Sequence, residues 1–220
     1  MMLFGPEKVE FLTDRISPVL RGVLLPACLI SAGLLFLSTS AISGSNPFLS
    51  ENRQNDVRLN DWLSYDNRVD LEDGSQLYQY VAEVSPQVER SDTASNTLSL
   101  PKIRFSFIPR FNCAPIISVV VAPVEKSKES RKQIIDALGR LKFSVDGTQV
   151  AYPSLTEGAG DKLAAHYDTE LQRRNTFRIL VEVGSRALVE IEDYGQYNYS
   201  LSGSKRAITR SLSRCRSHTI

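Results

Sequence analysis

The sequence predicts an α+β protein in which one N-terminal transmembrane helix precedes a mainly antiparallel β-sheet domain with a C-terminal helix. Residues 22–43 carry no charged side chain. Short runs after residue 61 alternate apolar and polar side chains, and apolar side chains near the end recur at helical spacing. The chain therefore divides into a cytoplasmic N-terminal segment (1–21), a transmembrane helix or signal segment (22–43), a tether (44–60) and an extracytoplasmic β-rich domain (61–220).

The uncharged segment 22–43 predicts a membrane address, because a helix satisfies its own backbone hydrogen bonds inside hydrocarbon. Lys8, Arg15 and Arg21 precede this segment, and basic residues there favour the cytoplasmic side. We therefore expect a single-pass protein of the bacterial inner membrane with its C-terminal domain in the periplasm. Small residues at 39–43 also suit a signal peptidase, so a cleaved, soluble periplasmic form stays open.

Residues 44–60 are polar and irregular, which is typical of a tether. The net charge of +1 conceals an asymmetry along the rest of the chain. Residues 51–100 hold ten acidic and four basic side chains, whereas residues 101–220 hold nineteen basic and twelve acidic ones. The two parts should attract each other or face different partners, and ordinary solvated surface is the remaining interpretation.

The β-rich domain opens with strand patterns. Residues 77–84 and 103–107 alternate in a way that predicts half-buried strands. The almost wholly apolar residues 116–122 predict a central strand that is buried on both faces.

Two hairpins are predicted further along. Asp146 and Gly147 tolerate positive φ, so they predict a tight turn between strands at 141–145 and 149–152. A second hairpin is predicted around Gly184 and Ser185. Its strands would be residues 176–183 and 186–192.

Helical spacing of apolar side chains predicts helices at 127–138, at 161–173 with Asp161 as N-cap, and from Ser204 as N-cap. The last is the clearest of the three. Its apolar face comprises Ala207, Ile208, Ser211, Leu212 and Cys215. This face should carry Cys215 onto the core.

The three cysteines are Cys28, in the uncharged segment, and Cys113 and Cys215 beyond it. A pair in an oxidising compartment predicts a disulfide bond, which would fasten the final helix to an inner strand. Two unpaired buried thiols are the other interpretation. The cysteines and the distant His166 and His218 lack the spacing of a zinc site, so we expect no metal ion.

Several short motifs are spread over residues 60–215. They are Trp62, Arg-Phe-Asn-Cys at 110–113, Phe-Ser-Val-Asp-Gly at 143–147, and Tyr-Ser-Leu-Ser-Gly-Ser at 199–204, followed by Ala207 and Cys215. In these motifs the chain resembles small periplasmic β-rich disulfide domains such as the type VI secretion-associated periplasmic protein family. The resemblance implies a fold in which a strand ending in a Leu-Ser-Gly turn leads into a C-terminal helix with a closing cysteine. The chain differs in lacking an early cysteine pair and in its longer anchor.

Few side chains are candidates for catalysis. A triad built on His166 would need a nucleophile element, and the chain has no Gly-x-Ser-x-Gly motif. Glu190 and Glu192 alternate on one strand and could share a proton or hold a cation, but solvated strand edges commonly carry such acids. We expect no catalytic site and no cofactor. The rival interpretation is a periplasmic hydrolase or polymer-processing enzyme that uses His166 or the Glu190/Glu192 pair.

The near-neutral charge and the expected external location argue against nucleic acid as a partner. Tyr194, Tyr197, Arg206 and Arg210 form a candidate contact patch. The function that these observations predict is a membrane-anchored, non-catalytic binding or assembly module outside the cytoplasm. Its expected partners are the membrane and a protein of an envelope or secretion-related complex, and its oligomeric state is not predicted.

Overall fold

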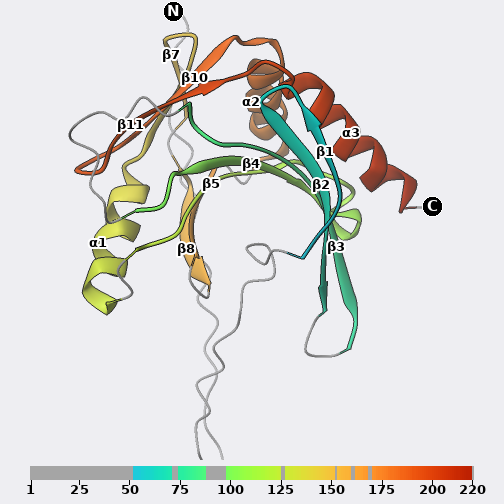
Figure 1. The fold of residues 1–220 in the computed structure, drawn as a ribbon, viewed down its shortest axis with the longest axis horizontal. Coiled ribbons are helices and arrows are strands. Elements are labelled where there is room, and N and C mark those ends of the chain that lie inside the picture. Colours follow the sequence, from blue (N-terminus) through green and yellow to red (C-terminus); the bar gives the residue numbers. More distant parts are fainter. Residues whose placement is uncertain are drawn as a thin grey trace, which may run out of the picture. The chain divides into compact units, whose positions relative to one another are not determined.

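Two antiparallel sheets and three α-helices make up the described part of the chain (Figure 1). The computed structural model describes residues 52–70, 74–87, 98–124, 127–151, 153–159, 162–167 and 170–219. The α+β class and the mainly antiparallel sheet are confirmed. The predicted cytoplasmic segment and transmembrane helix lie outside these residues. Among the described helices, none has the length and apolar character needed to cross a bilayer.

The larger sheet has seven strands, and all neighbours in it are antiparallel. In spatial order they are β1 (Arg53–Leu59), β2 (Trp62–Asp70), β3 (Gln76–Val84), β4 (Lys102–Phe107), β5 (Ile116–Val121), β9 (Lys162–Tyr167) and β8 (Leu155–Ala159). Strand β5 lies between β4 and β9. Ile117 and Val119 on one of its faces and Ser118 and Val120 on the other are all buried. The prediction of a doubly buried inner strand is therefore confirmed.

The smaller sheet has four strands. In spatial order they are β11 (Gly195–Ser200), β10 (Arg186–Ile191), β6 (Lys142–Val145) and β7 (Thr148–Ala151). The turn between β6 and β7 is the predicted one, with φ of 47° at Asp146 and 81° at Gly147. The Asp146 carboxylate accepts hydrogen bonds from the backbone N–H groups of Ser185 and Arg186 at 3.0 and 2.9 Å. The hairpin turn is thereby tied to the start of β10.

The helices close the core against one face of the larger sheet. They are α1 (Lys128–Gly139), α2 (Leu171–Val183) and α3 (Ser204–Ser217). Helix α1 matches its prediction and is capped by the Ser127 hydroxyl, which accepts from the N–H of Ser130 at 3.1 Å. On the face of the larger sheet that is buried in this core lie Trp62 of β2, Ala82 of β3 and Phe105 of β4.

Helix α3 packs across β1, β2, β3 and β4 and is bound to them by polar contacts as well (Figure 1). Within the core the Ser211 hydroxyl donates to the carbonyl of Val81 at 2.8 Å. One turn further along the helix, Arg214 donates from Nε to the Asp66 carboxylate at 2.7 Å. Gly203, with φ of 91°, is the N-cap, whereas the predicted cap, Ser204, donates its hydroxyl hydrogen bond to the Val181 carbonyl of α2.

The predicted disulfide bond between Cys113 and Cys215 is present, with 5.9 Å between the two Cα atoms. Cys113 precedes β5 and Cys215 lies in the last turns of α3. The bond therefore links the end of the terminal helix to the entry of an inner strand, as expected.

Two predicted elements were wrong. Residues 161–173 do not form one helix, because 162–167 are strand β9, which pairs with β5, and α2 starts only at Leu171. Residues 176–183 are not a strand but most of α2. Local β-propensity there is overridden by packing, since Phe177 and Val181 lie four residues apart and are both buried, as on one face of a helix.

The predicted tether at 44–60 also requires correction. Its residues 53–59 form β1, an edge strand that pairs with β2 through a β-bulge between Gln54 and Val57. Asn55 in this bulge has φ of 56°, a conformation that asparagine tolerates. The polar composition of this segment thus reflects an exposed edge strand.

Candidate functional site

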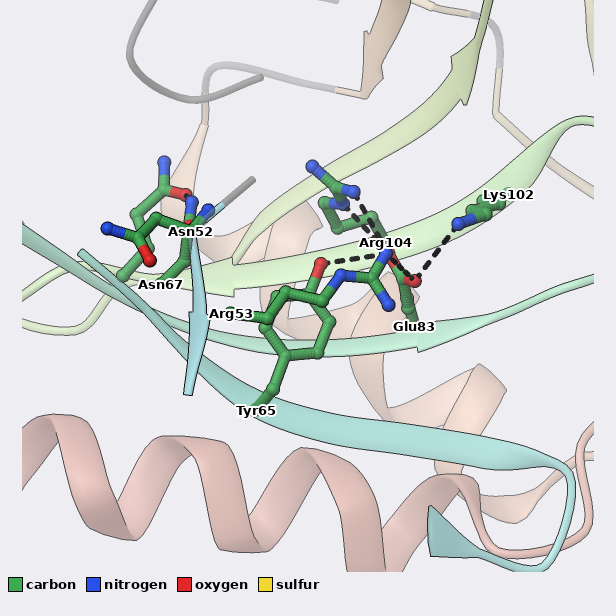
Figure 2. Close-up of polar contacts among 8 residues, drawn as sticks. Asn52, Arg53, Tyr65, Asn67, Glu83, Lys102 and Arg104 are labelled. Carbon is green, nitrogen blue, oxygen red and sulfur yellow. Dashed lines mark hydrogen bonds and ion pairs between the residues drawn. The ribbon is translucent and has the colours of Figure 1, made fainter. Parts of the chain in front are cut away.

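The most distinctive polar site is a buried charge cluster on the larger sheet, on the face opposite α3. We call it the Glu83 cluster, and it comprises Arg53, Tyr65, Glu83, Lys102 and Arg104 (Figure 2). Ala82 and Val84 point into the helix-covered core, so the strand's alternation turns Glu83 to the other face. Glu83 lies directly opposite Arg104 in the pairing of β3 with β4.

Both carboxylate oxygens of Glu83 accept hydrogen bonds. Oε1 accepts from Arg53 Nη2 at 2.9 Å and from Lys102 Nζ at 3.3 Å. Oε2 accepts from Arg104 through Nε at 3.2 Å and Nη2 at 2.9 Å, and from the Tyr65 hydroxyl at 3.0 Å. Figure 2 shows these donors converging on the carboxylate from β1, β2 and β4.

Electrostatics keeps this cluster ionised. Burial by itself would raise the pKa of Glu83, but the charges of Arg104, Lys102 and Arg53 outweigh burial, so its pKa lies below the ordinary value. Burial raises the pKa of Tyr65, which stays a neutral donor. Glu83 is 3% exposed and Arg104 is 1% exposed, so each depends on the other for compensation of its charge.

A chain of amides continues the polar face beside the cluster. The Asn52 backbone N–H donates to Asn67 Oδ1 at 2.6 Å, and Asn67 Nδ2 donates to Gln79 Oε1 at 2.9 Å. Asn67 and Gln79 are opposite each other on β2 and β3 and are both buried.

Within the Glu83 cluster, the guanidinium of Arg53 also lies 4.5 Å from the centre of the Tyr65 ring, and this contact restrains the position of Arg53.

A depression of about 410 Å³ adjoins the Glu83 cluster. Its lining comprises Arg53, Arg58, Asp61, Leu63, Glu83, Ser85, Pro86, Gln87 and Lys102. Arg53 and Lys102 thus bind Glu83 and also form part of the wall, while Arg58 is exposed. Cationic side chains can donate charge-assisted hydrogen bonds to an anion, and arginine does not exchange its proton near neutral pH.

The candidate catalytic residues lie in separate places. His166 is on β9 of the larger sheet, in register with Ser118 and Leu155, and is not on a helix. Glu190 belongs to β10 of the smaller sheet, whereas Glu192 lies in the turn after it, so the two acids do not alternate on one strand as predicted. They form separate ion pairs, Glu190 with Lys142 and Glu192 with Arg140. Within the described ranges, no three His, Cys, Asp or Glu side chains gather as metal ligands would.

The candidate contact patch is divided by the fold. Tyr194 lies in the turn before β11, and Tyr197 is largely buried, donating its hydroxyl hydrogen bond to the Tyr194 carbonyl at 3.0 Å. Arg206 and Arg210 lie on α3, which follows the opposite end of β11. Their guanidinium groups donate to Asn60 Oδ1 at 2.9 Å and to the Asn55 carbonyl at 3.3 Å.

The Glu83 cluster is the feature that the sequence did not reveal. Two signals for it were present: Glu83 interrupts an apolar run, and Arg104 stands between Ile103 and Phe105. The sequence alone did not place these two opposite charges in register on neighbouring strands. The ion pairs of Glu83 with Lys102 and Arg104 also join the acid-rich part of the chain to the base-rich part.

Comparisons of the chain with protein-family models, with curated proteins and with solved structures find no match. The resemblance to the type VI secretion-associated periplasmic family therefore stays a prediction from sequence motifs.

Proposed function

We propose that the chain is a membrane-anchored binding or assembly module whose folded domain works outside the cytoplasm, as a component of an envelope complex. The anchor in this proposal is the uncharged segment 22–43. The domain beyond it would bind partners through its surface, without a chemical step.

The observation that carries the proposal is the Cys113–Cys215 disulfide bond. Disulfide bonds form and persist in oxidising compartments and are rare in the bacterial cytosol. This bond links α3 to the entry of β5, and an oxidising compartment is where such a link would form and persist. Basic residues before the uncharged segment support the same orientation.

The character of the polar residues supports binding over catalysis. The buried carboxylate of Glu83 has a lowered pKa, which disfavours proton transfer near neutral pH. Arg53, Lys102 and Arg104 surround it and give the site a fixed positive wall, which is suited to recognition.

Thiol labelling in the native host tests the compartment. We expect Cys113 and Cys215 to resist a maleimide probe under denaturing conditions until a reductant is added, with Cys28 replaced by serine to remove its signal. In the matched Cys215→Ser control, Cys113 should react without reductant. A green fluorescent protein fused at the C-terminus should stay dark. Reactive thiols in the oxidised sample, or a fluorescent fusion, would contradict the proposal.

A complementation experiment separates the module from the rival enzyme. His166→Ala and the double variant Glu190→Ala/Glu192→Ala should each restore a deletion strain of the native host as well as the unchanged gene does. Loss of complementation by a variant that still forms its disulfide bond would favour the enzyme.

A further inference from the structure

We propose that the depression beside the Glu83 cluster is a binding site for a phosphomonoester group carried by a small molecule or by a lipid. The inference goes beyond the proposed function, because it concerns the ligand of one pocket whatever the compartment or the assembly. It rests on the charge, the geometry and the rigidity of the residues that line this depression.

Charge is the first argument. Among the residues that the structure describes, the lining holds the three cations Arg53, Arg58 and Lys102 and the two carboxylates of Asp61 and Glu83. Arg104 lies behind Glu83 and binds one of its oxygens through two nitrogens. The charge of Arg104 balances that of Glu83. The three lining cations are then opposed by one carboxylate, that of Asp61, which leaves the depression with an excess of positive charge. A phosphomonoester carries a charge of about −1.5 to −2 near neutral pH, which matches this excess better than one carboxylate does.

The placement of the cations is the second argument. Arg53 and Arg58 come from the two ends of β1, and Lys102 comes from the start of β4. They therefore approach the depression from three positions around it. Three donors in such an arrangement suit the three terminal oxygens of a tetrahedral phosphate group, whereas a planar carboxylate offers only two oxygens.

The third argument is rigidity. Arg53 is restrained by Glu83 Oε1 and by the ring of Tyr65, and Lys102 by the same oxygen. Two of the three cations are thereby held in place before a ligand arrives, which lowers the entropic cost of binding. Arg58 is exposed and completes the set from the rim.

The size and the remaining lining indicate what carries the phosphate. A volume of about 410 Å³ lies in the range of small-molecule sites and exceeds what a bare phosphate needs. Leu63 and Pro86 give the depression an apolar wall, and Ser85 and Gln87 add uncharged polar groups. The ligand should therefore carry a compact organic part, such as glycerol, beside the phosphate.

Calorimetric titration of the full-length protein in mild detergent tests the proposal, at pH 8 and at constant ionic strength. The probes are inorganic phosphate, glycerol 3-phosphate, water-soluble dibutyryl phosphatidic acid, and acetate as the carboxylate control. We expect the phosphates to bind and acetate to bind at least tenfold more weakly. A preference for the phosphatidic acid over glycerol 3-phosphate would assign a lipid source, and equal or weaker binding of it would assign a soluble one.

Arg58→Gln is the informative variant, because Arg58 is exposed and lies outside the Glu83 cluster. Loss of one charge-assisted contact should weaken phosphate binding about tenfold. Arg186→Gln is the matched control, since Arg186 is an exposed arginine of β10 in the smaller sheet, and it should bind phosphate as the unchanged protein does.

Three results would overturn the inference: no heat of binding with any phosphate, equal affinities for acetate and phosphate, or an Arg58→Gln variant that binds like the Arg186→Gln control. Lys102→Gln, with its thermal unfolding recorded in parallel, provides a second test from β4. None of these results depends on the compartment, so failure here is distinguishable from failure of the proposed function, which the thiol and reporter experiments decide.

Discussion

Replacing Glu83 by glutamine should destabilise the protein strongly, because it removes a charge that buried cations require. Glutamine has nearly the same shape and can still accept one hydrogen bond. It leaves the Arg104 guanidinium, 1% exposed, without the carboxylate that it binds at 2.9 and 3.2 Å. Breaking a buried ion pair from one side costs about 3–5 kcal/mol. We expect the lower end, about 3 kcal/mol, since the glutamine oxygen remains as an acceptor.

Urea unfolding followed by fluorescence measures this effect. Trp62 is the single tryptophan of the chain and is fully buried, so its emission reports loss of the core. With a urea dependence of about 2 kcal/mol/M, a loss of about 3 kcal/mol lowers the midpoint by about 1.5 M. Glu192→Gln is the control, because Glu192 is half exposed and binds an exposed arginine, Arg140. Its midpoint should match that of the unchanged protein.

The outcome can refute the reasoning directly. If Glu83→Gln shifts the midpoint no more than Glu192→Gln does, the buried charges are not coupled as the distances imply. A second variant distinguishes charge from packing: Glu83→Leu combined with Arg104→Met removes both charges. Replacing a buried pair by apolar side chains is often nearly neutral, so this double variant should be more stable than Glu83→Gln.

Three further predictions concern other features of the fold. The lowered pKa of Glu83 stabilises the folded state at pH values above the unfolded pKa of about 4.3. That stabilisation should be lost as the pH falls through the pKa of the folded state. Glu83→Gln should therefore flatten the acid limb of a pH–stability curve measured by urea unfolding. Reducing the bond between Cys113 and Cys215, 102 residues apart, should lower the free energy of unfolding in urea by at most about 4.7 kcal/mol. The stability of a Cys113→Ser/Cys215→Ser variant should not change with reductant. An equal midpoint with and without reductant in the unchanged protein would count against a structural bond. Gly203→Ala should lower the thermal stability of the protein more than Gly147→Ala does. Both glycines have positive φ, but a Cβ at Gly203 would lie 2.0 Å from the Leu59 carbonyl oxygen, whereas one at Gly147 meets nothing within 4 Å. Equal losses of stability would mean that this close approach is relaxed in solution.

The sequence was most informative where a pattern is strictly local. The alternation at 103–107, the apolar run at 116–122 and the Asp146-Gly147 turn each specify an element by themselves, and all three have their predicted form. Sequence reasoning failed at 161–173 and 176–183. Strand β9 is made by pairing with β5, and α2 is made by packing Phe177 against the rings of Phe143 and Tyr167, at 4.9 and 5.2 Å between centroids. Such partners are distant in sequence, so local propensity was overruled.

By itself the sequence determined that this chain holds a mainly antiparallel β domain ending in a helix, because periods of two and of 3.6 residues are recorded in the order of its side chains. The sequence also predicted that Cys113, before an inner strand, would pair with Cys215 on the final helix. Only the tertiary structure decided that Glu83 and Arg104 meet on one buried face, and that Arg53 and Lys102 line a depression beside them. Strand register and the pairing of distant segments arise from the whole core together, and no short stretch of residues encodes them.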